Sequence, residues 1–96
     1  MEYKDKVILI TGGTGSLGKA LTSYFLENHP EIKKLIIFSR DEQKQFQMAQ
    51  EFPDSQFPQI RFFIGDVRDY ERLKRAFQQV DYVIHAAAMK HRVALL

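Results

Sequence analysis

The sequence predicts an α/β fold in which parallel strands alternate with helices. Short continuous apolar runs, typical of strands that are covered on both faces of a sheet, alternate along the chain with segments of helical periodicity. A glycine-rich turn joins the first apolar run to the first helical segment. Strands that alternate with helices form parallel sheets with right-handed connections.

Each element has its own signal in the sequence. The runs VILI, KLIIFS, IRFFIG and DYVIHAAA predict strands, and apolar residues three and four positions apart predict helices between them. Pro30 and Pro53 should end the first two helices. Ser39 and Glu42 match a capping box for the second helix, and Asp69 can cap the third. The expected strands span residues 7–10, 34–39, 60–65 and 81–88, and the expected helices span residues 17–28, 39–52 and 69–80.

This order of elements indicates the N-terminal half of a doubly wound (Rossmann) parallel sheet, with strands in the order 3-2-1-4. The 96 residues make one partial domain, residues 1–96. The helix at 69–80 alone would cover one face of the sheet, and the fourth strand would be an edge. We therefore expect exposed apolar surface and either marginal stability or self-association, as in a homo-oligomer.

The composition excludes several classes of protein. A hydrophobic share of 45% and a charged share of 27% are those of a globular domain, not of a disordered chain. The absence of cysteine excludes disulfides and thiolate metal sites, and the three histidines lack metal-ligand spacing. A net charge of +2 with interspersed acids and bases argues against a nucleic-acid partner. No apolar run approaches a membrane span and the start is no signal peptide, so we expect a cytoplasmic protein without a membrane partner.

The glycine-rich turn, residues 11–18 (TGGTGSLG), predicts a phosphate-binding loop. It contains the spacing T-G-x-x-G-x-x-G, follows a predicted strand and opens a predicted helix, which is the context that a dinucleotide site requires. Gly12 would turn the chain, Gly15 would leave room for a pyrophosphate, and Gly18 would let the helix approach the strand. Backbone N–H groups from Thr14 to Leu17 would point at the anion.

A Walker-type ATP site is the alternative for this turn. Residues 13–19 fit G-x-x-x-x-G-K, but the next residue is Ala20, so the hydroxyl that would bind magnesium is missing. The crowded glycines also suit a dinucleotide better.

The end of the second strand predicts NADP rather than NAD. Ser39, Arg40 and Lys44 place a hydroxyl and two cations where an acid would bind the ribose of NAD, and an arginine suits a 2′-phosphate. Asp41 or Glu42 could still serve as that acid, which leaves NAD open. Alternatively, both carboxylates could be ordinary acids in the first turn of the helix.

The third and fourth strands supply further candidates at the same edge of the sheet. Asp66 could accept the adenine amino hydrogen, with the backbone of Val67 beside it. The small side chains of Ala86 and Ala87 would let a cofactor lie against the end of the fourth strand. Ligands bind at the carboxyl ends of strands in such sheets, so these stretches converge on one crevice.

The stretches TGGTGSLG, SRDEQK, FFIGDVRD and HAAAMKH, in this order and spacing, resemble the extended short-chain dehydrogenase/reductase superfamily. Within it they are most similar to the inverting UDP-N-acetylglucosamine 4,6-dehydratases of the polysaccharide biosynthesis group. The likeness covers nearly the whole chain, from about residue 5 to residue 91. It implies NADP held by Thr14 to Leu17, Ser39, Arg40, Lys44, Asp66, Val67, Ala86 and Lys90, with Lys90 also contacting a nucleotide-sugar substrate.

The resemblance also implies a reaction, in which C4 of the sugar is oxidised, water is eliminated across C5–C6, and the hydride returns to C6. The catalytic Tyr-x-x-x-Lys of that family lies beyond residue 96, and the one formal match here, Tyr70 with Lys74, falls on the third helix. We therefore expect a truncated, inactive cofactor-binding part of a dehydratase. A stand-alone nucleotide-binding or interaction module, a fragment of an NAD-dependent sugar epimerase, and a remnant without function are the alternatives.

Overall fold

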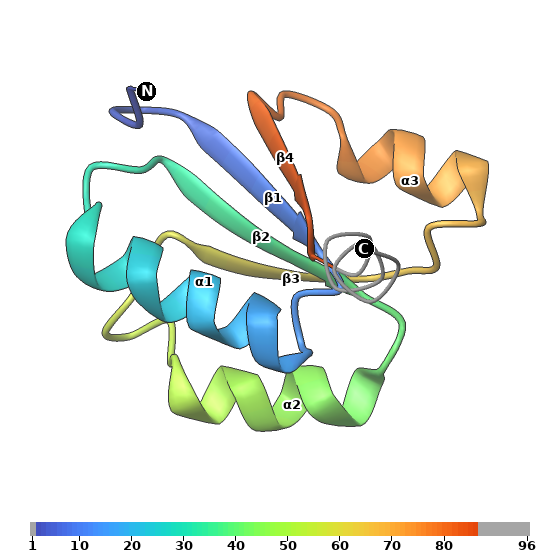
Figure 1. The fold of residues 1–96 in the computed structure, drawn as a ribbon, viewed down its shortest axis with the longest axis horizontal. Coiled ribbons are helices and arrows are strands. Elements are labelled where there is room, and N and C mark those ends of the chain that lie inside the picture. The colour runs from blue at the N-terminus through green and yellow to red at the C-terminus, as the bar shows by residue number, and fades with distance from the viewer. Residues whose placement is uncertain (1, 87–96) are drawn as a thin grey trace, which may run out of the picture.

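A computed structural model of the chain describes residues 2–86 and confirms the predicted α/β fold. Four parallel strands form one sheet in the predicted order, β3-β2-β1-β4, and their carboxyl ends meet at one edge (Figure 1). The strands are β1 (Val7–Thr11), β2 (Lys34–Ser39), β3 (Ile60–Ile64) and β4 (Tyr82–His85). The helices are α1 (Ser16–Asn28), α2 (Glu42–Glu51) and α3 (Tyr70–Ala76).

Helices cover the two faces of the sheet unequally. Ile8 of β1 packs in one apolar cluster with Phe25 of α1 and Met48 of α2. Its neighbour Leu9 packs in a second cluster with Ala76 of α3. Because successive residues of a strand point to opposite faces, α1 and α2 lie on one face and α3 lies alone on the other, as Figure 1 shows.

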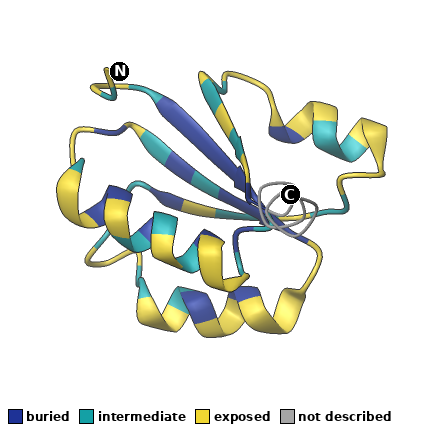
Figure 2. Ribbon diagram, in the orientation of Figure 1, coloured by how far each residue is buried: buried dark blue, intermediate teal, exposed yellow. Residues whose placement is uncertain are grey.

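The centre of the core is β1, which is buried along its whole length (Figure 2). The face under α3 is less well covered: Val83 of β4 is 46% exposed and Phe77, just after α3, is 39% exposed. The exposed apolar surface expected on this face is therefore present. Self-association through it stays a prediction.

The predicted capping box at the second helix is wrong. Asp41 caps α2 instead, because its carboxylate accepts a hydrogen bond from the backbone N–H of Lys44 at 2.9 Å. Ser39 remains in β2, where it lies opposite Ile64 of β3, and Glu42 is the first residue of the helix. Strand pairing thus continues through Ser39 and delays the start of α2.

Most other bounds agree with the prediction to within one residue, but the ends of α3 and β4 differ by more. Asp69 caps α3 as predicted, but the helix ends at Ala76 rather than at residue 80, because the chain turns through Gln79 in the left-handed region with a φ of 64°. Val80 still packs against the core after this turn. β4 ends at His85, which places Ala86 just beyond the strand, and residues 87 and 88 lie outside the described residues.

Among residues 2–86, the helices are all too short and too polar to cross a membrane.

The first turn of α1 lies directly against the glycine loop. A Cβ added at Gly18 would lie 2.5 Å from the carbonyl carbon, the Cα and the oxygen of Gly13, all of which are backbone atoms. A Cβ at Gly15 would meet only the carbonyl oxygen of Gly12, at an ordinary 3.5 Å. The fold therefore needs glycine at position 18, whereas position 15 has room for a side chain.

Replacement of Gly18 by alanine is expected to lower the free energy of unfolding by about 2 kcal/mol, because backbone atoms cannot yield to the new Cβ as a flexible side chain would. The steric clash should therefore outweigh the ~1 kcal/mol by which alanine stabilises a helix interior relative to glycine. Urea denaturation measures it. Gly15→Ala is the matched control, with an expected loss of about 0.5 kcal/mol at the N-cap, and equal stability of Gly18→Ala and the wild type would contradict this account.

Candidate functional site

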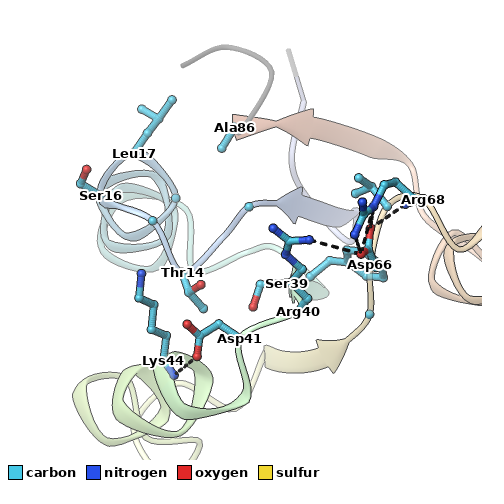
Figure 3. Close-up of a pocket in the computed structure, with 16 residues that line it drawn as sticks. Thr14, Ser16, Leu17, Ser39, Arg40, Asp41, Lys44, Asp66, Arg68 and Ala86 are labelled. Atoms are coloured by element: carbon cyan, nitrogen blue, oxygen red, sulfur yellow. Dashed lines mark hydrogen bonds and ion pairs between the residues drawn. The ribbon is translucent and has the colours of Figure 1, made fainter. Parts of the chain in front are cut away.

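A pocket of about 710 Å³ lies at the edge of the sheet where the strands end (Figure 3). The loop after β1, the turn after β2, the turn after β3 and the residue after β4 all contribute to it. Its lining consists of Gly12, Thr14, Gly15, Ser16, Leu17, Gly18, Phe38, Ser39, Arg40, Asp41, Lys44, Gly65, Asp66, Val67, Arg68 and Ala86. The carboxyl edge of a parallel sheet is where doubly wound folds bind their ligands.

The glycine loop forms one wall of the pocket. Gly12 has a φ of 65°, which side chains rarely adopt, and the N–H of Gly15 closes the turn on the carbonyl of Gly12 at 3.2 Å. α1 then begins at Ser16 with no side-chain cap and no acidic residue in its first turn. The first N–H groups of a helix have no acceptor within the helix, and they carry partial positive charge. This end of α1 is therefore suited to an anion.

The end of β2 forms the opposite wall with a hydroxyl and two cations. Ser39 is the last strand residue and is 8% exposed, while the Arg40 side chain is 72% exposed. Lys44 stands on the first turn of α2, and Figure 3 shows its side chain extending toward the glycine loop. Asp41 lies between them, but its carboxylate is engaged in capping α2. This outcome favours the interpretation of Asp41 as an ordinary helix acid.

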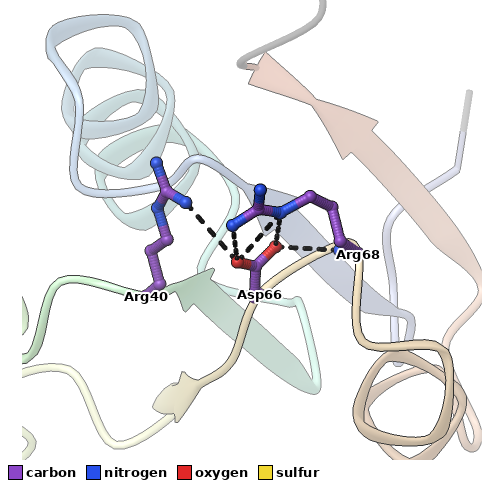
Figure 4. A network of polar contacts seen from close by, with 3 residues as sticks. All are labelled: Arg40, Asp66 and Arg68. Carbon is purple, nitrogen blue, oxygen red and sulfur yellow. Dashed lines mark hydrogen bonds and ion pairs between the residues drawn. The ribbon is translucent and has the colours of Figure 1, made fainter.

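Asp66, in the turn after β3, is held between two arginines (Figure 4). Its Oδ2 accepts from Nη2 of Arg68 at 2.7 Å and from Nη1 of Arg40 at 3.4 Å, and its Oδ1 accepts from the backbone N–H of Arg68 at 2.9 Å. The hydrogen bonds from Arg68 hold the pKa of the Asp66 carboxyl well below its usual range. Asp66 is thus ionised at neutral pH, and its carboxylate forms ion pairs with both Arg68 and Arg40.

Every predicted cofactor residue that lies within residues 2–86 lines this one pocket. Their role in binding stays a prediction. Two further predicted residues, Ala87 and Lys90, lie outside the described residues. Tyr70 and Lys74, the formal Tyr-x-x-x-Lys match, do not line the pocket.

Sequence reasoning missed three residues of the lining. Phe38 is fully buried, and Gly65 lies so close to it that an added Cβ would be 2.8 Å from the Phe38 ring. Arg68 could have been found from the stretch GDVRD, because a basic residue two positions after Asp66 can fold back on its carboxylate.

Within the described residues, histidines and acids form no cluster that could hold a metal ion.

Comparison with known proteins agrees with this geometry. The family described as "Polysaccharide biosynthesis protein" matches residues 8–95. A UDP-N-acetylglucosamine 4,6-dehydratase (inverting) of Campylobacter jejuni is 60% identical over 89 residues, which are 93% of this chain and 25% of that protein. A UDP-glucose 4-epimerase of Rickettsia bellii is 51% identical over 90 residues, which are 92% of this chain and 26% of the epimerase. The chain thus spans about a quarter of the length of the curated relatives it matches.

Two solved structures share the fold. The protein Pen from Bacillus thuringiensis superimposes with a TM-score of 0.76 at 43% identity, over 86% of this chain and 24% of that one. A short chain dehydrogenase from Bacillus anthracis superimposes with a TM-score of 0.71 at 28% identity, over 86% of this chain and 35% of the dehydrogenase. With a Rossmann-type sheet like that of the dehydrogenase and a family match over residues 8–95, the chain belongs to the polysaccharide biosynthesis protein family.

Proposed function

We propose that this chain is the NADP-binding N-terminal region of a nucleotide-sugar 4,6-dehydratase. The similarity to the Campylobacter jejuni UDP-N-acetylglucosamine 4,6-dehydratase supports the reaction class and a nucleotide-sugar substrate. The pocket at the carboxyl edge of the sheet supports a dinucleotide as the ligand that these residues hold.

The space at Gly15 is the main observation in support of a phosphate ligand. Neither packing nor backbone conformation requires a glycine there, since an added Cβ would meet only one atom at 3.5 Å and φ is −75°. A glycine that packing does not require, at the N-terminus of α1 and in the wall of a pocket, fits a backbone that a pyrophosphate approaches closely.

The charges around Ser39 favour NADP over NAD. NAD sites use a carboxylate to accept hydrogen bonds from the ribose hydroxyls. In this pocket Asp41 caps α2 and Asp66 is paired with Arg68, whereas Arg40 and Lys44 are available to an added phosphate. A 2′-phosphate would draw Arg40 from its long 3.4 Å contact with Asp66.

When bound, NADP would supply a hydride acceptor and later a hydride donor. The residues of this chain would bind and orient it: the glycine loop at the pyrophosphate, Ser39 with Arg40 and Lys44 at the 2′-phosphate, and the turn that holds Asp66 and Val67 at the adenine. Among residues 2–86, no counterpart of the catalytic tyrosine and lysine of the dehydratases lines this pocket, since Tyr70 and Lys74 of α3 lie outside its lining. We infer that residues 1–96 bind the cofactor without turning over substrate.

A sugar epimerase is the second candidate. The 51% identity to the Rickettsia bellii UDP-glucose 4-epimerase favours it, because the same cofactor-binding region could serve either reaction. An NAD preference of this chain would favour the epimerase assignment.

Replacement of Arg40 by alanine is expected to weaken NADP binding about tenfold, because a hydrogen bond to a charged group is lost. NAD binding should change by no more than about twofold, because NAD lacks the 2′-phosphate that this hydrogen bond holds. Calorimetric titration of the 96-residue chain measures both affinities. Arg75→Ala, an exposed arginine on α3, is the matched control, and an equal loss for both dinucleotides would refute the role of Arg40.

Replacement of Gly15 by alanine is expected to weaken NADP and NAD alike, by about tenfold or more, because both carry the pyrophosphate. The chain should still fold, since position 15 has room for a methyl group. The same titration, made beside a thermal melt, separates lost binding from lost folding. Unchanged affinity in a folded Gly15→Ala chain would remove the main support for a phosphate at this loop.

Incubation of the 96-residue chain with NADP and UDP-N-acetylglucosamine is expected to give no 4-keto-6-deoxy sugar, because no Tyr-x-x-x-Lys pair from residues 2–86 lines the pocket. NMR of the nucleotide sugar follows the reaction, with the Campylobacter jejuni dehydratase assayed in parallel as the positive control. Formation of product by the chain alone would overturn the inferred inactivity.

A further inference from the structure

The side chain of Gln45 is buried on the inner face of α2, where it joins three parts of the molecule. The residue is 4% exposed. Its Nε2 lies 3.2 Å from the carbonyl oxygen of Ser39, 2.9 Å from Oγ of Ser39 and 3.1 Å from the carbonyl oxygen of Phe63. One amide thus ties α2 to the last residue of β2 and to the edge strand β3.

The surroundings of this amide determine which of its atoms is the nitrogen. Carbonyl oxygens only accept hydrogen bonds, and two of them, from Ser39 and Phe63, contact the same atom of Gln45. An amide oxygen in that place would face two other oxygens without a proton between them. Nε2 is therefore the atom that contacts Ser39, and it can act only as a donor.

The hydroxyl of Ser39 can consequently donate its proton only to a group other than Gln45. Its Oγ accepts from Nε2 of Gln45, so its own proton must point elsewhere. Within residues 2–86 no protein acceptor receives that proton, and Ser39 lines the pocket. Helix capping does not use the hydroxyl either, because Asp41 caps α2. The Ser39 proton is therefore available to an acceptor inside the pocket.

We propose that Gln45 is a positioning residue for cofactor specificity, which acts by holding the Ser39 hydroxyl as a donor toward the 2′-phosphate. This proposal rests on the NADP binding proposed above and assigns a role to a residue that lies outside the pocket lining. A phosphate dianion only accepts hydrogen bonds, and a hydrogen bond to it is roughly twice as strong as one between neutral groups. A fixed donor thus favours the 2′-phosphate over the neutral 2′-hydroxyl of NAD.

The test measures selectivity rather than affinity alone. The probes are adenosine 2′,5′-bisphosphate and adenosine 5′-monophosphate, which differ only in the 2′-phosphate. Each is titrated into the 96-residue wild-type chain, Ser39→Ala, Gln45→Met and the double variant, after a melt has shown that the chain is folded. Gln47→Met is the matched control, because Gln47 is an exposed glutamine on the same helix.

We expect Ser39→Ala to lower the preference for the bisphosphate about tenfold. Gln45→Met should lower it severalfold, and the double variant should be no less selective than Ser39→Ala alone, because Gln45 acts through Ser39. Equal losses for both probes, or a Gln45→Met effect that persists in full without the serine hydroxyl, would overturn the proposal while NADP binding stands. A wild-type chain with no preference for the bisphosphate would overturn the proposed NADP binding as well.

If Gln45→Met does not fold, an NMR measurement on the wild-type chain still tests the proposed role of Gln45. When the Ser39 hydroxyl donates to a phosphate, its oxygen becomes a stronger acceptor for Gln45, since linked hydrogen bonds polarise one another. The side-chain amide protons of Gln45 should then shift downfield in the NMR spectrum with the bisphosphate and not with the monophosphate. The same shift with both probes, or with neither, would contradict the proposed role.

Discussion

The close approach of Gly18 to the backbone of Gly13 determines how α1 leaves β1, and the pocket depends on that geometry. Without a side chain at position 18, the first turn of the helix lies against the loop and its N-terminus faces the carboxyl edge of the sheet. The strands β2, β3 and β4 end at the same edge because all are parallel to β1. A helix end with partial positive charge and three strand ends thus meet in one place.

The glycines near this edge serve two different purposes. Gly18 and Gly65 are required by packing, since an added Cβ at either position would lie within 3 Å of Gly13 or Phe38. Gly15 meets no such restriction, and the proposed phosphate ligand would account for its lack of a side chain. This contrast separates the glycines that the packing of the pocket requires from the one proposed to make room for a ligand.

The charges in the pocket are arranged in a similar way. Asp41 and Asp66 are both engaged by the protein, the first with the backbone of α2 and the second mainly with Arg68. Arg40 keeps only a long 3.4 Å contact with Asp66, and Lys44 extends toward the glycine loop (Figure 3), so that both cations could reach an anion in the pocket. Gln45 is uncharged, and its side-chain amide donates a hydrogen bond to the Ser39 hydroxyl at the pocket wall. This hydrogen bond links α2 to that hydroxyl.

The sequence by itself determined the strands, the helices and the glycine loop, because periodicity and the steric needs of a tight turn are properties of neighbouring residues. The alternation of these elements then predicted the parallel sheet and its strand order. It also brought the candidate residues to one edge, since parallel strands end together. Only the tertiary structure decided the hydrogen bonds that orient them. Gln45 meets a carbonyl 18 residues away, and Arg40 meets Asp66 across 26 residues. Strand pairing likewise kept Ser39 in β2 and left the cap of α2 to Asp41, since which donor finds which acceptor depends on distances that arise only when the strands lie side by side.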